Sequence, residues 1–166
     1  MKMKACAFTG HRPEKLPFGN NEQDCRCRKL KQQISHQIVL QIRDGVSIFI
    51  TGMARGVDVW AAEAVLECKR ILDNELQLWA FIPYDRQPAR WSLEEQQRYN
   101  VILKKADRVE YISHGYYDGC LLKRNRSMVD AATHLIAVYD ENQPGGTKYT
   151  IDYARRKGLE ITIIEP

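Results

Sequence analysis

Hydrophobic positions along the chain follow two alternating patterns. Short apolar runs such as Val46–Thr51 (VSIFIT) and Glu160–Ile164 (EITII) are typical of strands buried on both faces. Between such runs, apolar residues recur every three or four positions, as Leu30, Ile34 and Ile38 do, which indicates amphipathic helices. The pattern predicts six strands and five helices in strict alternation.

Turn and cap residues set the expected limits of these elements. Ser92 with Glu95 forms a capping-box pattern, and Gly45 and Gly158 are expected to end helices. The predicted strands span residues 4–9, 46–51, 76–82, 108–112, 134–139 and 160–164. The predicted helices span residues 22–44, 57–72, 92–106, 121–132 and 147–157. Alternation of this kind predicts an α/β fold: a doubly wound, mainly parallel six-stranded sheet with helices on both faces. Because no linker or repeat interrupts it, we expect a single domain over residues 1–166.

Composition narrows the class of protein without naming a function. With 44% hydrophobic and 28% charged residues among 166, the chain has the composition of a globular protein and not of a disordered one. No apolar stretch approaches the roughly 18 residues of a membrane span, and the apolar run near the N-terminus is too short for a signal peptide. We therefore expect a cytoplasmic protein without a membrane partner. The net charge of +4 is compatible with an anionic ligand and does not require nucleic acid.

The cysteines indicate reduced thiols. Their number is odd and their spacing is scattered, and no second Cys or His pair lies at the spacing of a zinc site. The five are Cys6, Cys25, Cys27, Cys68 and Cys120. We expect no disulfide and no metal.

In an open parallel sheet, ligands bind beyond the carboxyl ends of the strands, so the loops after the strands are the candidate sites. The first strand is followed by Thr9, Gly10, His11 and Arg12. Glycine at this point allows a tight turn, and the Arg12 guanidinium is a two-point donor suited to phosphate or carboxylate. The alternative is a plain turn with polar residues facing solvent.

The loop after the second strand has two glycines four residues apart and leads into a helix, which places free amides opposite an anion. It lacks the pattern of a Walker loop and that of a dinucleotide fingerprint. Asp58 either caps the helix or accepts hydrogen bonds from ligand hydroxyls. The candidate binding residues here are Gly52, Met53, Ala54, Arg55, Gly56 and Asp58.

The loop after the fifth strand offers a third candidate anion site. Gly145, Gly146 and Thr147 lie at a strand-to-helix junction, where amides at a helix start are unpaired. Tyr84 follows the third strand and is expected to border the same cleft. The segment 114–119 after the fourth strand is a candidate lid.

Three motifs taken together resemble the SLOG superfamily, and its YpsA-like branch most. They are Gly-His-Arg-Pro at 10–13, Gly-Met-Ala-Arg-Gly-Val-Asp at 52–58 and Pro-Gly-Gly-Thr at 144–147. The resemblance spans nearly the whole chain and implies a Rossmann-like domain. It also implies a nucleotide or nucleotide-derived ligand at the ends of the strands.

Two related families imply sharper alternatives. The stretch 52–58 is similar to the Gly-x-Ala-Arg-Gly-Ile-Asp motif of the DNA-processing protein A family, which binds single-stranded DNA. Pro-Gly-Gly is similar to the motif of LOG-type phosphoribohydrolases, which cleave nucleoside monophosphates. That motif continues Gly-Thr-x-x-Glu, where this chain has Lys148, Tyr149 and Asp152. If the chain is such an enzyme, Arg55 and Asp152 are its candidate catalytic residues.

The first functional hypothesis is therefore binding or sensing of a nucleotide-like small molecule in a cleft at the carboxyl ends of the strands. The alternatives are a nucleoside-phosphate N-glycosidase, a single-stranded DNA-binding module, and a scaffold that has lost its ligand. The nucleotide-derived ligand is the one bound molecule that we expect, and no further cofactor is predicted. Self-association into a homo-oligomer is compatible with each hypothesis.

Overall fold

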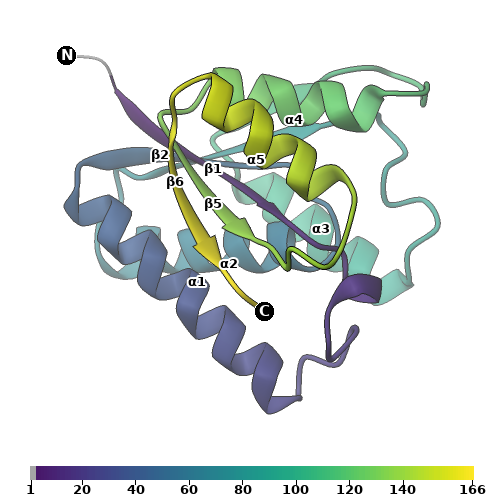
Figure 1. Ribbon diagram of the computed structural model, residues 1–166, viewed down its shortest axis with the longest axis horizontal. Helices are drawn as coiled ribbons and strands as arrows, with labels where there is room; N and C mark the ends of the chain where they lie inside the picture. The colour runs from purple at the N-terminus through teal and green to yellow at the C-terminus, as the bar shows by residue number, and fades with distance from the viewer. Residues whose placement is uncertain (1–2) are drawn as a thin grey trace.

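The computed structural model describes residues 3–166. Its centre is one six-stranded sheet in the order β4-β3-β2-β1-β5-β6, in which all neighbouring strands run parallel (Figure 1). Five α-helices alternate with the strands along the chain. The predicted α/β class and the Rossmann-like winding are therefore confirmed.

The observed elements differ from the predicted ones by at most three residues at either end, and two strands match their predicted limits. The strands are β1 (Lys4–Gly10), β2 (Val46–Thr51), β3 (Gln77–Ile82), β4 (Arg108–Tyr111), β5 (His134–Val138) and β6 (Glu160–Ile164). The helices are α1 (Cys25–Arg43), α2 (Val57–Ile71), α3 (Leu93–Lys105), α4 (Cys120–Asp130) and α5 (Gly146–Arg156). A short 3₁₀ turn, η1 (Pro13–Lys15), follows β1 and was not predicted.

Local side-chain chemistry accounts for the helix limits. Ser92 and Glu95 form the expected capping box at the start of α3. The predicted start of α1 at residue 22 was wrong, because Asp24 accepts a hydrogen bond from the amide of Arg26 and so sets the start at Cys25. Gly45 follows α1 with φ +92°, a conformation that favours glycine and ends the helix there.

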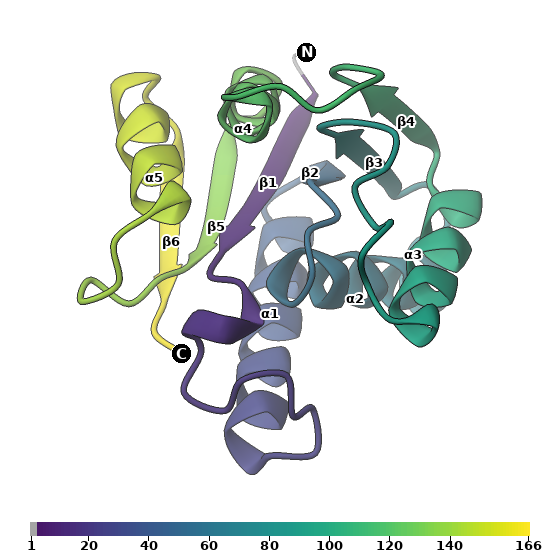
Figure 2. The same ribbon diagram turned by 90° about the vertical axis from the view of Figure 1, so that its right-hand side faces the viewer.

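Helices cover both faces of the sheet. One core lies between the sheet and α1, α2 and α3, and contains Phe8, Phe49 and Trp60. A second core lies under α4 and α5, and contains Ala7, Ile50 and other small or branched residues of the opposite strand faces. Figure 2 shows the two groups of helices on either side of the sheet. This two-face burial explains why the inner strands are apolar at nearly every position.

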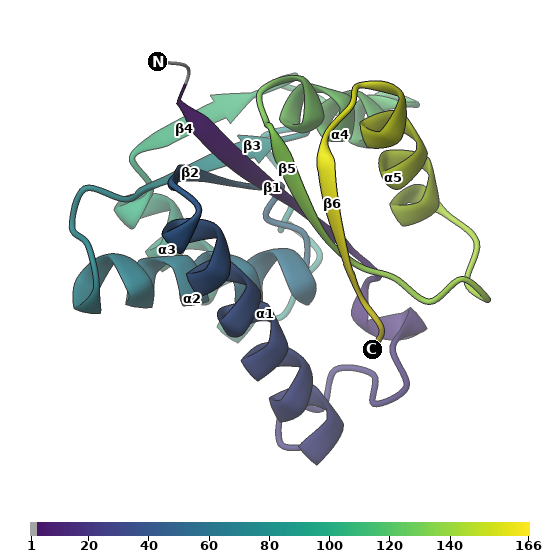
Figure 3. The same ribbon diagram turned by 60° about the vertical axis from the view of Figure 1, so that its left-hand side comes forward.

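The direction of winding reverses between two neighbouring strands. From β1 the chain proceeds through β2 to β4 toward one edge, and it then crosses to β5 and continues to β6 at the other edge. Figure 3 shows β1, β5 and β6 ending on the side of the molecule where η1 lies. A crevice outside the carboxyl ends of strands at such a reversal is the usual ligand position in this kind of fold.

Two further findings concern the expectations from composition. No helix in the described part of the chain is long and apolar enough to cross a membrane. All five cysteines are free thiols, and only Cys25 is exposed.

Candidate functional site

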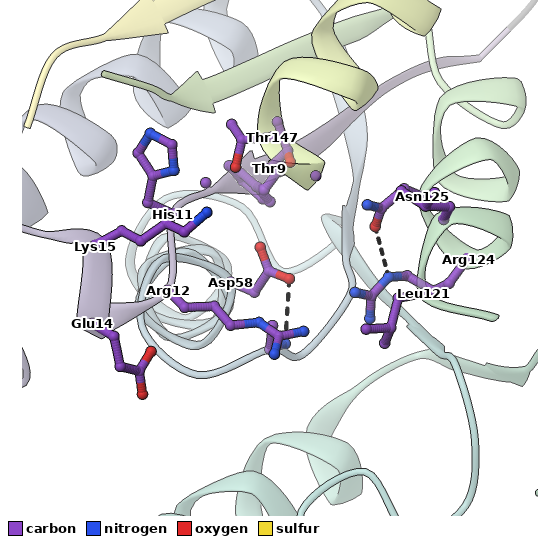
Figure 4. Close-up of a pocket in the computed structure, with 15 residues that line it drawn as sticks. Thr9, His11, Arg12, Glu14, Lys15, Asp58, Leu121, Arg124, Asn125 and Thr147 are labelled. Carbon is purple, nitrogen blue, oxygen red and sulfur yellow. Dashed lines mark hydrogen bonds between the residues drawn. The ribbon is translucent and has the colours of Figure 1, made fainter. Parts of the chain in front are cut away.

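A pocket of about 440 Å³ lies where the winding reverses, outside the carboxyl ends of β1 and β5 (Figure 4). Its walls come from the end of β1, η1, the start of α2, the first turns of α4 and the start of α5. We call it the switch-point pocket. Its lining residues are Phe8, Thr9, Gly10, His11, Arg12, Glu14, Lys15, Ala54, Asp58, Leu121, Leu122, Arg124, Asn125, Gly146 and Thr147.

The end of β1 is shaped by close packing against α2. A Cβ at Gly10 would lie 2.7 Å from the Val57 side chain, so the strand end approaches the helix as only glycine allows. The next side chain, His11, is buried, and its Nε2 accepts a hydrogen bond from the Asp140 amide at 3.0 Å. The same nitrogen lies 3.3 Å from the Asp140 carbonyl oxygen, and burial lowers the pKa of His11, which favours the neutral imidazole whose Nε2 accepts from the amide.

Arg12 supplies a positive charge at the mouth of the pocket. Its side chain is exposed, and no carboxylate of the described residues lies within ion-pair distance of it. A guanidinium without a partner beside a pocket is a suitable donor to a phosphate or carboxylate group.

Two mostly buried threonines line the pocket, one from the end of β1 and one from the first turn of α5. Thr9 is 7% exposed and Thr147 is 6% exposed, and both line the pocket. Neither hydroxyl has a hydrogen-bond partner among residues 3–166, and neither oxygen is among the fully buried unpaired atoms, so both are accessible to a ligand. Both are drawn in Figure 4.

The start of α5 adds backbone donors beside these hydroxyls. Gly145 precedes the helix and no side chain caps it, so the first-turn amides keep their hydrogens free. Unpaired amides and the positive end of the helix dipole both favour an anion at this point.

Hydrogen bonds within the loop between β2 and α2 hold it in shape. The amide of Met53 donates to Thr51 Oγ1 at 3.2 Å, and the amide of Ala54 donates to Asp58 Oδ2 at 3.2 Å. The Thr51 hydroxyl donates in turn to the Asp58 carbonyl. Met53 is fully buried with φ +56°, a left-handed conformation that is uncommon for a residue with a side chain. These two amides therefore have intramolecular acceptors.

Two buried charges form the floor of the pocket. Arg124 on α4 donates from Nη1 to the Gly52 carbonyl at 2.5 Å and from Nε to Asn125 Oδ1 at 2.8 Å. Burial raises the pKa of Asp58, and the positive charge of Arg124 opposes that shift. Burial likewise lowers the pKa of Arg124, and the Asp58 carboxylate opposes this. Each charge is therefore stabilised by the other.

The predicted site residues separate into three groups. Eight line the switch-point pocket: Thr9, Gly10, His11, Arg12, Ala54, Asp58, Gly146 and Thr147. Gly52, Met53, Gly56 and Gly145 belong to its surrounding loops and do not line it. Arg55 and Tyr84 line a neighbouring hollow.

Neither catalytic candidate lines the switch-point pocket. Arg55 pairs with Glu14 and, at 3.7 Å, with Glu95. Asp152 on α5 pairs with Lys148 at 2.7 Å and Arg155 at 3.5 Å, and it does not line the pocket.

Several lining residues gave no clear signal in the sequence. Glu14 and Lys15 reach the pocket because η1 turns the chain back toward β5, where Lys15 Nζ donates to the Pro144 carbonyl. A turn of three residues is too short for a periodic pattern to reveal. Leu121 and Leu122 could not be told from ordinary core residues in the sequence. No group of three or more metal-ligating side chains occurs among residues 3–166.

Comparisons with known proteins agree with this architecture. UPF0398 proteins from Bacillus cereus and Bacillus thuringiensis are each 31% identical to the chain over 159 residues, covering 94% of it and 85% of their own lengths. The solved structure of DNA processing protein A from Helicobacter pylori has a TM-score of 0.65 at 13% identity. The match covers 98% of this chain and 66%, just under two thirds, of that one. At this identity the likeness shows a shared fold.

The resemblance carried by the three loop motifs is tested by a family model. The model described as the YspA SLOG family (YpsA) matches residues 6–165. Nearly the whole chain is matched, including all three loops. The chain therefore belongs to the YspA SLOG family.

Proposed function

We propose that the chain binds a nucleotide-derived anion in the switch-point pocket. The observation that carries this proposal is that the hydroxyls of Thr9 and Thr147 line the pocket without a hydrogen-bond partner among residues 3–166, beside the free first-turn amides of α5. Hydroxyls and amides at a helix start are the donors that a phosphate group takes up.

The surrounding charges suit a phosphate with a sugar attached. Arg12 lines the pocket with no carboxylate of the described residues within ion-pair distance, so its guanidinium is available to a phosphate. The Asp58 carboxylate lines the same pocket and uses Oδ2 for the Ala54 amide, which leaves its other oxygen to accept from a ribose hydroxyl. The pocket volume of about 440 Å³ lies in the range of small-molecule sites.

Calorimetric titration with adenosine monophosphate, with adenosine as the phosphate-free control, tests the proposal. We expect binding of the nucleotide and a loss of about tenfold or more in affinity for Thr147→Val and for Arg12→Ala, because each removes a donor to a charged group. Arg28→Ala is the matched control, since Arg28 is likewise exposed and lies on α1 outside the pocket.

Failure would be evident from the same titrations. If guanosine, cytidine and uridine monophosphates also fail to bind at millimolar concentration, with the protein folded, the proposal is overturned. Equal affinity for adenosine and its monophosphate would show that the donors at α5 do not bind a phosphate.

The positions of the two candidate catalytic residues favour binding of a nucleotide over its hydrolysis. Neither Arg55 nor Asp152 lines the switch-point pocket. We therefore expect chromatography to detect no base released from these nucleotides. Release that is abolished by Asp152→Asn would instead support the N-glycosidase hypothesis.

Single-stranded DNA binding is described for the Helicobacter pylori protein of the same fold. If this chain also binds DNA strands, its affinity should fall steeply with salt, because each neutralised phosphate releases counterions. A salt titration with an oligonucleotide separates that function from binding of a single nucleotide.

A further inference from the structure

A second hollow of about 850 Å³ adjoins the switch-point pocket and shares Arg12, Ala54 and Leu121 with it. Its other walls come from the segment between β3 and α3 and from the loop before α4. All four charged residues that line it are arginines: Arg12, Arg55, Arg86 and Arg90. We call this hollow the arginine pocket.

Three of these four arginines have no carboxylate partner among the described residues. Arg55 pairs with Glu14 and Glu95. In the part of the chain that the structure describes, no carboxylate lies within 4.0 Å of the guanidinium nitrogens of Arg12, Arg86 or Arg90. Guanidinium groups without an ion-pair partner around one hollow create a positive potential, which the Asp58 carboxylate offsets only in part at Arg12 and which an anion would neutralise.

Aromatic side chains lie among the arginines. Tyr84 contacts Tyr116 edge to face, with ring centroids 5.4 Å apart, and Trp91 contacts Tyr99 in the same way at 5.5 Å. Tyr116 is 62% exposed. An edge contact occupies only part of an aromatic side chain, so a planar base can stack on a remaining ring face.

The oxygen of a buried side-chain amide in the arginine pocket lacks a hydrogen-bond partner within residues 3–166. Gln87 lines the arginine pocket and is 8% exposed, and its Oε1 has no donor among the described residues. Its Nε2 donates to the Gly52 carbonyl at 3.4 Å, which is the carbonyl that also accepts from Arg124. A buried acceptor without a donor, in a hollow of this charge, is a second and independent indication of a ligand.

We propose that the arginine pocket is a second subsite of the same ligand and takes its second base and a further phosphate. This inference rests on the proposed function, since the first nucleotide occupies the switch-point pocket. Arg12 lines both pockets and so binds the phosphate that links the two halves. The ligand class is accordingly a dinucleotide and not a mononucleotide.

Calorimetry with two adenine probes tests this assignment. Linear diadenylate with a 5′-phosphate should bind at least about tenfold more tightly than adenosine monophosphate, because charge-assisted contacts are added. The double variant R86Q/R90Q should lose that gain and keep the affinity for the monophosphate. Both arginines are exposed, so the variant is expected to fold. R28Q is the control, because it also removes the charge of an exposed arginine but lies outside both pockets.

The possible results separate the two proposals. If the monophosphate binds but the diadenylate binds no more tightly, and R86Q/R90Q changes neither affinity, the second subsite is overturned and the first pocket stands. If neither probe binds, the proposed function fails and this inference fails with it. If a strand of about twelve deoxyadenosines binds far more tightly than the diadenylate, the hollow is part of a nucleic-acid track and the dinucleotide assignment is overturned.

Discussion

The guanidinium of Arg124 fills the space beside the Cα of Gly52. Its Nη1 lies 2.5 Å from the Gly52 carbonyl oxygen, and a Cβ built at residue 52 would lie 2.8 Å from the Arg124 Cζ. The loop that follows β2 and the second turn of α4 therefore approach each other closely at Gly52, where a Cβ would displace the bonded Arg124 guanidinium.

Gly52→Ala is expected to lower the free energy of unfolding by about 1–3 kcal/mol, because the buried guanidinium must move or the loop must shift. Gly115→Ala is the matched control, since a Cβ there meets no atom within 4 Å. Its effect should stay within about 0.5 kcal/mol. Urea denaturation measures both values, and equal values for the two variants would contradict the close fit.

Arg124→Met should destabilise the fold by about 3 kcal/mol, because it removes the larger of the two positive charges, Arg124 and Arg12, that stabilise the buried Asp58 carboxylate. Asp58→Asn should also destabilise, for the converse reason. The double variant should cost less than the two single losses added together. Additive losses in this double-mutant cycle would show that the two charges do not stabilise each other.

The stability of the protein should fall as the pH drops from about 7 to 5, in part through His11. Burial lowers the pKa of His11 in the folded state, so below its ordinary pKa of about 6.5 the unfolded chain binds the proton more readily. The slope from one such group is at most about 1.4 kcal/mol per pH unit.

His11→Gln isolates this contribution, because the Gln Oε1 can accept from the Asp140 amide without titrating. We expect the slope of unfolding free energy against pH, measured in urea at several pH values, to be smaller in the variant. An unchanged slope would assign the acid sensitivity to other groups.

Ser92→Ala should lower the free energy of unfolding by about 1 kcal/mol, because it removes the side-chain acceptor of the capping box at the start of α3. Ser35→Ala, in the interior of α1, should instead raise stability slightly, because alanine has the higher helix propensity. Opposite signs for the same substitution at two sites would support the capping role. A loss at both sites would argue against it.

The order of strands and helices was predictable because burial on two faces leaves a clear pattern. β2 and β5 are apolar along nearly their whole length, and α1 repeats its apolar residues at helical spacing. The first and last residues of the helices were harder to predict, since they depend on single hydrogen bonds such as the one that Asp24 accepts at the start of α1. The strict alternation predicted a mainly parallel sheet, and the structure has all six strands parallel, in an order that was not predicted.

The site was only partly predictable, because the sequence shows which residues follow a strand and not which way they turn. Thr9, Arg12 and Thr147 were identified by their position at strand ends, and they line one pocket. The amides of Met53 and Ala54 were expected to be free, yet both are bonded within their loop. Gln87 and Arg90 had no motif to mark them, because their importance arises from packing across elements.

The internal bonding of the β2–α2 loop has a consequence for selectivity. Because Thr51, Asp58 and the left-handed Met53 fix the loop among themselves, this wall of the pocket keeps its shape without a ligand. Because the loop is already ordered, it loses little conformational entropy when a ligand binds, and it adapts little to a ligand of a different shape. Ligand analogues that carry one additional methyl group on the side facing Ala54 should therefore be rejected by shape, and enlarging that wall by Ala54→Gly should relax the discrimination.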